Sequence, residues 1–125
     1  MLNYSITKVG DEPRVELKEV LALSGCEVSI NELPAGVSVP FVHEHKQNEE
    51  FYFVLSGKGR LFIDGEEREI VAGDAFRIAP KGKRCIAAAK DSAVKFICVQ
   101  TKKGSLTQWT NEDGVMSEGA KPSWL

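Results

Sequence analysis

Residues 36–57 read GVSVPFVHEHKQNEEFYFVLSG and contain both histidines of the protein. His43 and His45 are separated by one residue, and side chains at i and i+2 of a β-strand project from the same face, roughly 6–7 Å apart. A polar loop follows, and the apolar run of residues 51–55 predicts a second strand that begins near Glu50. Two imidazoles and one carboxylate are a ligand set that binds non-haem iron, zinc, nickel or manganese. The segment therefore predicts a metal site between two strands.

This stretch resembles the first motif of the cupin superfamily in its pattern of glycines, histidines and one glutamate. The positions that carry the resemblance are Gly36, His43, His45, Glu50 and Gly57. Residues 73–85, GDAFRIAPKGKRC, resemble the second cupin motif, which has a Gly-Asp pair, an apolar strand, a Pro-x-Gly turn and a closing histidine. Cys85 stands in place of that histidine, which is the fourth metal ligand of the family.

The resemblance implies an all-β fold, a single-domain cupin β-barrel of the jelly-roll or double-stranded β-helix type. We expect this domain to span residues 1–125, with residues 101–125 as a C-terminal tail. The family includes dioxygenases, isomerases and decarboxylases, so the resemblance implies a metal-dependent small-molecule enzyme without naming a reaction. A non-catalytic binding or sensing barrel and a structural zinc barrel are the alternatives. The resemblance also implies a homodimer.

Cys85 separates these alternatives. If its thiolate binds the ion together with His43, His45 and Glu50, the site is closed with four ligands, as in structural zinc sites. If Cys85 does not bind, the ion keeps open positions for a substrate. We expect the thiolate to bind, which favours zinc over iron, manganese or nickel, because sulfur is a soft ligand. Cys26 and Cys98 are expected to be small buried side chains.

Other polar and aromatic side chains have less specific roles. Tyr52 lies on the same predicted face as Glu50, which makes it a candidate for an acid, base or orienting role. Glu44 and Glu49 are expected to face solvent. Of six phenylalanines in the chain, five are expected in the core; they are Phe41, Phe53, Phe62, Phe76 and Phe96. A basic cluster could receive an anionic ligand or could be a solvated edge; it comprises Arg77, Lys81, Lys83 and Arg84.

Composition excludes several classes of protein. The net charge of −2 argues against nucleic acid as a partner, and no apolar run is long enough to cross a membrane. The N-terminus lacks the basic start and apolar core of a signal peptide, and three cysteines are too few for a disulfide framework. We therefore expect a cytoplasmic protein whose partner is a small molecule.

Turn residues divide the rest of the chain into short strands, as in a sandwich or barrel. The Asp64-Gly65 pair predicts a tight hairpin, and residues 56–59 predict a turn. Residues 37–45 are expected to form the strand that carries the histidines, with an irregular or edge portion at Pro40. The expected strands cover residues 26–33, 37–45, 50–55, 60–63, 66–71, 75–79, 85–89 and 93–100. Trp109 and Trp124, in the tail, could pack on the barrel or on a partner subunit.

Overall fold

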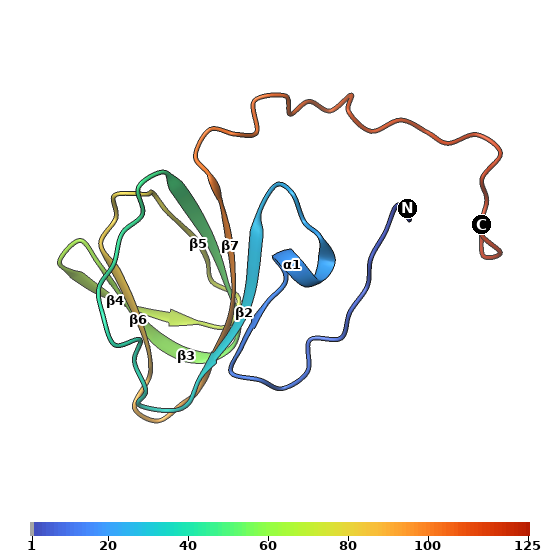
Figure 1. Cartoon of the computed structure of the whole chain (residues 1–125). Helices are drawn as coiled ribbons and strands as arrows, with labels where there is room; N and C mark the ends of the chain where they lie inside the picture. The colour runs from blue at the N-terminus through green and yellow to red at the C-terminus, as the bar shows by residue number, and fades with distance from the viewer. Residues whose placement is uncertain (1) are drawn as a thin grey trace.

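A computed structural model describes residues 2–125 of this chain. Seven strands form an antiparallel sheet that folds over into two facing halves, the jelly roll predicted from the sequence (Figure 1). One half contains β1, β2, β7, the first part of β3, and β5; the other contains β4, the second part of β3, and β6. The elements are β1 Arg14–Glu16, α1 Lys18–Leu21, β2 Glu27–Leu33, β3 Asn48–Ile63, β4 Glu66–Val71, β5 Ala75–Ile78, β6 Arg84–Ala88 and β7 Val94–Lys102.

Strand β3 is shared by both halves, so the turn predicted at residues 56–59 is wrong. The strand continues through this region, and its pairing with β7 shifts register between Val54 and Ser56, as at a β-bulge. Gly57 has φ +80°, and a Cβ there would lie 1.8 Å from the carbonyl oxygen of Ala93. These small residues bend one long strand from the first half of the sheet into the second, instead of reversing the chain.

The segment that carries the histidines is less regular than the predicted strand. Residues 36–45 form only two isolated bridges to β6, Ser38 with Ala87 and His43 with Arg84. The three residues before His43 form no bridge to β6. The first of them, Pro40, has no N–H to donate to such a bridge. The segment therefore lies along the edge of β6 with a bulged centre, and His43 and His45 point inward from it without a continuous strand.

The core forms where apolar side chains of the two halves meet. On β3 and β7, inward positions alternate with outward ones, so Tyr52, Val54 and Phe96 are buried. The predicted hairpin is confirmed: Asp64 and Gly65 have φ of +49° and +87°, as a type I′ turn requires. Phe41 departs from the prediction of a core position, because 59% of its surface is exposed.

Both ends of the chain extend away from the barrel on the same side (Figure 1). The N-terminal arm leads into β1 and the four-residue α1, and no helix among residues 2–125 is long and apolar enough to cross a membrane. Residues 103–125 contain no helix or strand. Trp109 and Trp124 are 64% and 86% exposed, so neither packs on the barrel of its own chain.

Candidate metal centre

Three side chains converge inside the barrel from two neighbouring segments. His43 and His45 come from the irregular edge segment, and Glu50 is the first buried residue of β3. One ligand atom from each residue lies within 4.8 Å of the other two. His43 and His45 are half-buried and Glu50 is buried, so the arrangement matches the spacing that their sequence pattern predicts.

Backbone hydrogen bonds hold the two histidines in place. His43 exchanges two hydrogen bonds with Arg84 of β6, each 3.0 Å long, and the N–H of His45 donates to the Pro80 carbonyl at 2.8 Å. The two rings are nearly perpendicular, with centroids 5.2 Å apart. Arg84 and Pro80 both belong to the second motif, residues 73–85, so that motif positions the histidines of the first.

Two imidazole nitrogens in this cluster are buried and lack a hydrogen-bond partner among the described residues, Nδ1 of His43 and Nε2 of His45. Nε2 of His45 lies 3.3 Å from Oε2 of Glu50, close enough for attraction but without hydrogen-bond geometry. Buried polar atoms normally have partners, so two such atoms beside a carboxylate are exceptional. A divalent metal between them would satisfy both nitrogens, and the donor set is the one such metals prefer.

Glu50 is the centre of a buried hydrogen-bond network. Its Oε1 accepts from the Tyr52 hydroxyl at 2.7 Å and from Arg84 Nη1 at 2.5 Å, and its Oε2 accepts from the Cys98 thiol at 3.4 Å. Burial alone would raise the pKa of Glu50, but the hydrogen bonds from Tyr52 and Arg84 and the charge of Arg84 lower it below its usual value. Glu50 is therefore a carboxylate with one oxygen largely committed to Tyr52 and Arg84, and the other directed toward His45.

Arg84 differs from every expectation for the basic cluster. It is 1% exposed, and besides Glu50 its guanidinium donates to the carbonyls of Ala79, Pro80 and Gly82 at 2.8–3.1 Å. Arg77, Lys81 and Lys83 are exposed, as a solvated edge requires. The positive charge of Arg84 thus neutralises Glu50 inside the barrel, and the four residues do not form one patch.

Cys85 lies beside this cluster but does not join it. Its thiol donates to the carbonyl of Val39 at 3.2 Å and lies 3.7 Å from the Ser38 hydroxyl. In β6 the buried positions are Arg84, Ile86 and Ala88, so the side chain of Arg84 points toward the barrel interior. A shift of one residue moves a side chain to the opposite face of a strand. The ligand role predicted for Cys85 stays a prediction, and the geometry brings Arg84 to Glu50 instead.

Tyr52 and Cys98 flank Glu50 as neutral hydrogen-bond donors. The Tyr52 ring stacks on Phe76 with centroids 5.0 Å apart. Burial, followed by the nearby thiol and carboxylate, raises the pKa of Tyr52 far above its usual value. Burial and the charge of Glu50 raise the pKa of Cys98 to about 12. At neutral pH these groups orient the carboxylate as protonated donors, a role consistent with Tyr52 as an orienting residue.

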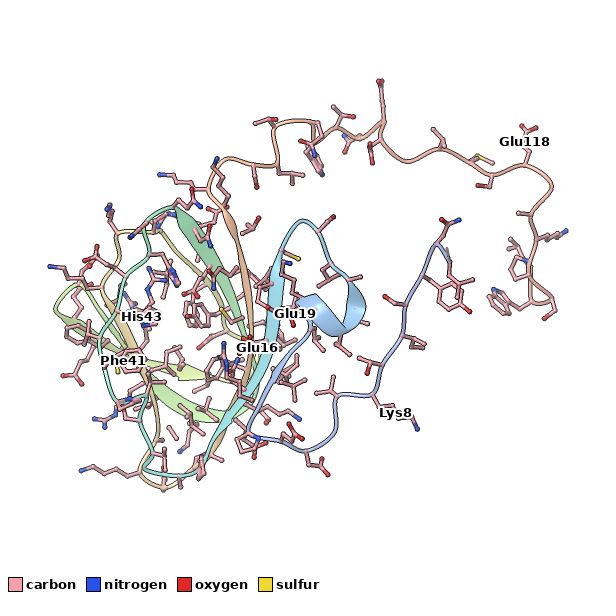
Figure 2. All side chains as sticks on the ribbon, viewed as in Figure 1. Lys8, Glu16, Glu19, Phe41, His43 and Glu118 are labelled. Carbon is pink, nitrogen blue, oxygen red and sulfur yellow. The ribbon has the colours of Figure 1, made fainter. Side chains whose placement is uncertain are left out.

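His43 is biased toward the neutral form that a metal ligand requires. Burial lowers the pKa of His43; Glu50 opposes this shift, and the charges of Arg84 and His45 add to it. Phe41 lies edge-on to this ring, with centroids 5.7 Å apart, and Figure 2 shows both side chains on the same wall of the barrel. Phe41 thus contacts the imidazole and lines the same cavity.

The cluster lines a cavity of about 550 Å³. Its walls combine apolar side chains, including Ile86 and Phe96, with polar residues from β1, β2 and β7. A volume of this size accommodates a small organic molecule, and such pockets place a few polar groups in an apolar lining. A ligand in this cavity would contact the histidines at one end.

Sequence reasoning missed Arg84 and Cys98. For Arg84 a signal was available, because Arg84, Ile86 and Ala88 alternate along one strand, which pairs the arginine with the apolar face. The burial predicted for Cys98 is confirmed, because it follows the buried Val94 and Phe96 at the same period; the prediction missed only its contact with Glu50. Its contact with Glu50 depends on the register that pairs β3 with β7, and no local pattern shows that register.

Comparisons with known proteins agree with this architecture. The family model described as a cupin domain matches residues 29–100. A cupin protein from Bacteroides fragilis is similar in structure, with a TM-score of 0.90 and 59% identity over 94% of this chain and 99% of that one. An uncharacterised protein of Methanocaldococcus jannaschii is 34% identical over 74% of each chain. A sugar phosphate isomerase of the cupin superfamily from Silicibacter pomeroyi has 26% identity and a TM-score of 0.64, over 72% of this chain and 60% of that one.

Proposed function

Because this chain belongs to the cupin family, we propose that it binds a divalent transition metal and acts through it on a small molecule held in the barrel. His43, His45 and Glu50 would hold the ion. The observation that carries the proposal is the pair of buried, unpartnered imidazole nitrogens beside Oε2 of Glu50. Nothing else among the described residues offers these atoms a partner, whereas a metal ion would.

Zinc, iron, manganese and nickel all suit two imidazoles and a carboxylate. With three protein ligands the ion would keep open positions, as in catalytic sites. A metal bound there would supply Lewis acidity toward an oxygen of the ligand. The protein contributes the orientation of Glu50 through Tyr52 and Cys98, and an apolar wall that limits water in the cavity.

Among the reactions of the family, isomerisation is the first to test. The similarity to the Silicibacter pomeroyi sugar phosphate isomerase supports it, although this chain spans only 60% of that protein. A three-ligand site that polarises a carbonyl or hydroxyl oxygen suits such chemistry. Dioxygenase and decarboxylase activities follow as later assays.

A second candidate function, a binding barrel without turnover, is favoured by a specific observation. Tyr52 and Cys98 stay protonated at neutral pH, and Glu50 is held as an ion by Arg84. None of these three groups is poised to exchange a proton near pH 7. Such a barrel would hold the metal and ligand without transferring protons.

The experiment begins with metal analysis of protein purified without chelator. We expect about one equivalent of bound metal, or stoichiometric uptake of Zn²⁺, Fe²⁺, Mn²⁺ or Ni²⁺ by stripped protein. Absence of both would overturn the metal proposal. Each loaded form is then assayed with a panel of aldose and ketose phosphates, and with dioxygen for the iron form. Tight metal binding with no turnover in any assay would favour the second candidate.

We also propose that the chain forms a homodimer. The arms present apolar side chains with no surface of their own chain to cover them, each between 64% and 91% exposed. They are Leu2, Tyr4, Ile6, Leu106, Trp109, Val115, Met116, Trp124 and Leu125. Sedimentation equilibrium should show a dimer at micromolar concentration, weakened by a Trp109→Ser, Trp124→Ser double substitution. A monomer at tens of micromolar would contradict it.

A further inference from the structure

The five-stranded half of the sheet, formed by β1, β2, β7, the first part of β3, and β5, carries apolar side chains on both faces. Its inner face contributes Tyr52, Phe96 and Cys98 to the core. The positions between these point outward, and they form two apolar rows that cross neighbouring strands. The first row is Val15, Ile30, Ile97, Phe53 and Ala75, and the second is Val28, Val99 and Phe51, with Arg77 at its end on β5.

The outer face of the other half, formed by β4, the second part of β3 and β6, is mostly charged. Arg60 of β3 lies opposite Glu69 of β4, and Phe62 lies opposite Glu67. Arg60, Glu67 and Glu69 are all exposed. An antiparallel sheet with one face in water normally alternates apolar inward residues with polar outward ones. The second half follows this rule and the five-stranded half departs from it, so the outer face of the five-stranded half has the composition of a buried surface.

The helix of this chain is too small to cover that outer face. Among residues 2–125 the one helix is α1, whose four residues extend about 6 Å, whereas five strands span about 20 Å. Phe51 and Leu55, which both point outward from β3, accordingly remain 45% and 41% exposed. A contiguous exposed apolar surface is typical of a site that binds another molecule.

Polar side chains border the two apolar rows. Glu32 and Lys95 lie opposite each other at one end of the rows, Glu49 and Thr101 lie opposite each other at the other end, and Arg77 lies at the β5 edge. An apolar centre with a polar rim is the usual composition of a protein–protein interface. The two carboxylates and the two cations balance, so the rim would not repel an identical face. The contact of a two-fold dimer requires such self-complementarity.

Both arms of the chain leave the barrel on the side of β2 and β7, away from β4 and β6 (Figure 1). The arms carry the exposed apolar side chains on which the proposed homodimer rests. The outer face itself measures about 20 Å across the strands and about 23 Å along β3 from Glu49 to Ser56. This flat area is roughly half of the 800 Å² that each partner of a stable complex buries. The arms on the same side can supply the remainder.

We propose that the outer face of the five-stranded half packs against the same face of a second copy of this chain, with Phe51 and Ile97 near the centre of the contact. The inference deepens the proposed homodimer and rests on it, because it names the surface that the two copies share. The arms of each copy then lie against the other copy at the border of this face. The histidines and Glu50 point into the barrel from the opposite side of the sheet, so the contact leaves the candidate metal centre free.

The test uses the whole chain, and sedimentation equilibrium over a range of concentrations gives the dissociation constant of the dimer. Phe51→Glu places a charge within the apolar rows and should raise this constant about tenfold or more, because aromatic residues near the centre of an interface contribute most to binding. Val42→Glu is the matched control, since Val42 is 52% exposed but lies on the histidine segment. It should leave the constant unchanged. Far-UV circular dichroism of both variants should match that of the unaltered protein.

A second measurement needs no substitution and no bound metal. The methyl NMR signals of Ile30, Ile97 and Val99 should change as the unaltered protein is diluted from dimer to monomer, whereas those of Val42 should not. Unchanged signals from the first three residues in a protein that does dissociate would overturn this face and leave the homodimer proposal standing. Equal dissociation constants for Phe51→Glu and the unaltered protein would do the same. A monomer at tens of micromolar would overturn both proposals.

Discussion

The two motifs of this chain contribute to the barrel in opposite ways. The first, residues 36–57, places two imidazoles and a carboxylate around one point. The second, residues 73–85, places a buried guanidinium against that carboxylate. The first motif thus supplies groups that attract a cation, and the second supplies a cation of its own. Spacing alone describes the first motif well, whereas the second depends on which face of β6 each residue takes.

The largest loss of stability is expected when the ion pair between Arg84 of the second motif and Glu50 of the first is broken. Arg84→Met removes the buried partner of Glu50 and leaves three carbonyls without their donor. Breaking a buried pair in this way costs about 3–5 kcal/mol. The free energy of unfolding, from urea denaturation, should fall by this amount. Arg77→Met, on the exposed surface, is the control and should change it by less than about 0.5 kcal/mol. Similar values for both variants would mean that the buried pair contributes nothing.

The next effect concerns the first motif. His45→Ala removes one of three proposed ligands, and we expect Zn²⁺ affinity to fall more than about 100-fold, since loss of an outer-shell partner alone costs 10–100-fold. Equilibrium dialysis followed by metal analysis measures it. Glu44→Ala alters the exposed residue between the histidines and should leave the affinity unchanged. If both variants bind Zn²⁺ equally, the cluster is not the metal site.

Tyr52→Phe tests how much the hydrogen bond from Tyr52 to Glu50, both on β3, contributes to stability. The substitution removes a buried hydrogen bond to a charged group and keeps the ring stacked on Phe76. Such bonds contribute about 1.5–3 kcal/mol, less than the buried ion pair. Urea denaturation should show this loss, whereas Tyr4→Phe, at a position 71% exposed, should show none. An unchanged stability for Tyr52→Phe would place the hydroxyl outside the network.

The smallest effect is expected at Cys85. Because its thiol donates to Val39 and lies outside the ligand cluster, Cys85→Ser should change Zn²⁺ affinity by no more than about twofold. Cys26→Ser, at a half-buried position on the N-terminal side of β2, is the matched control. A tenfold loss confined to Cys85→Ser would instead put the thiolate in the coordination shell and restore the four-ligand site.

Much of the fold was readable because the strands are short and their turns have strong local signals. Asp64-Gly65 defined its hairpin, since both residues accept positive φ. The predictions failed where tertiary context outweighed local propensity. Residues 56–59 look like a turn, but the pairing of β3 with β4, β6 and β7 carries the strand through them. Pro40 predicted an irregular portion of the histidine strand, and in the structure the irregular backbone covers all of residues 36–45.

The local sequence was sufficient to predict that His43, His45 and Glu50 form a cluster able to hold a metal, because all three come from one stretch of eight residues. It was insufficient for the partners of Glu50. Arg84 and Cys98 are 34 and 48 residues away along the chain, and they reach the carboxylate only through the register of β6 and β7. Register is a long-range property, and one residue of slip in β6 would move Arg84 away from Glu50. Folding therefore determined that the second motif places a positive charge against this carboxylate.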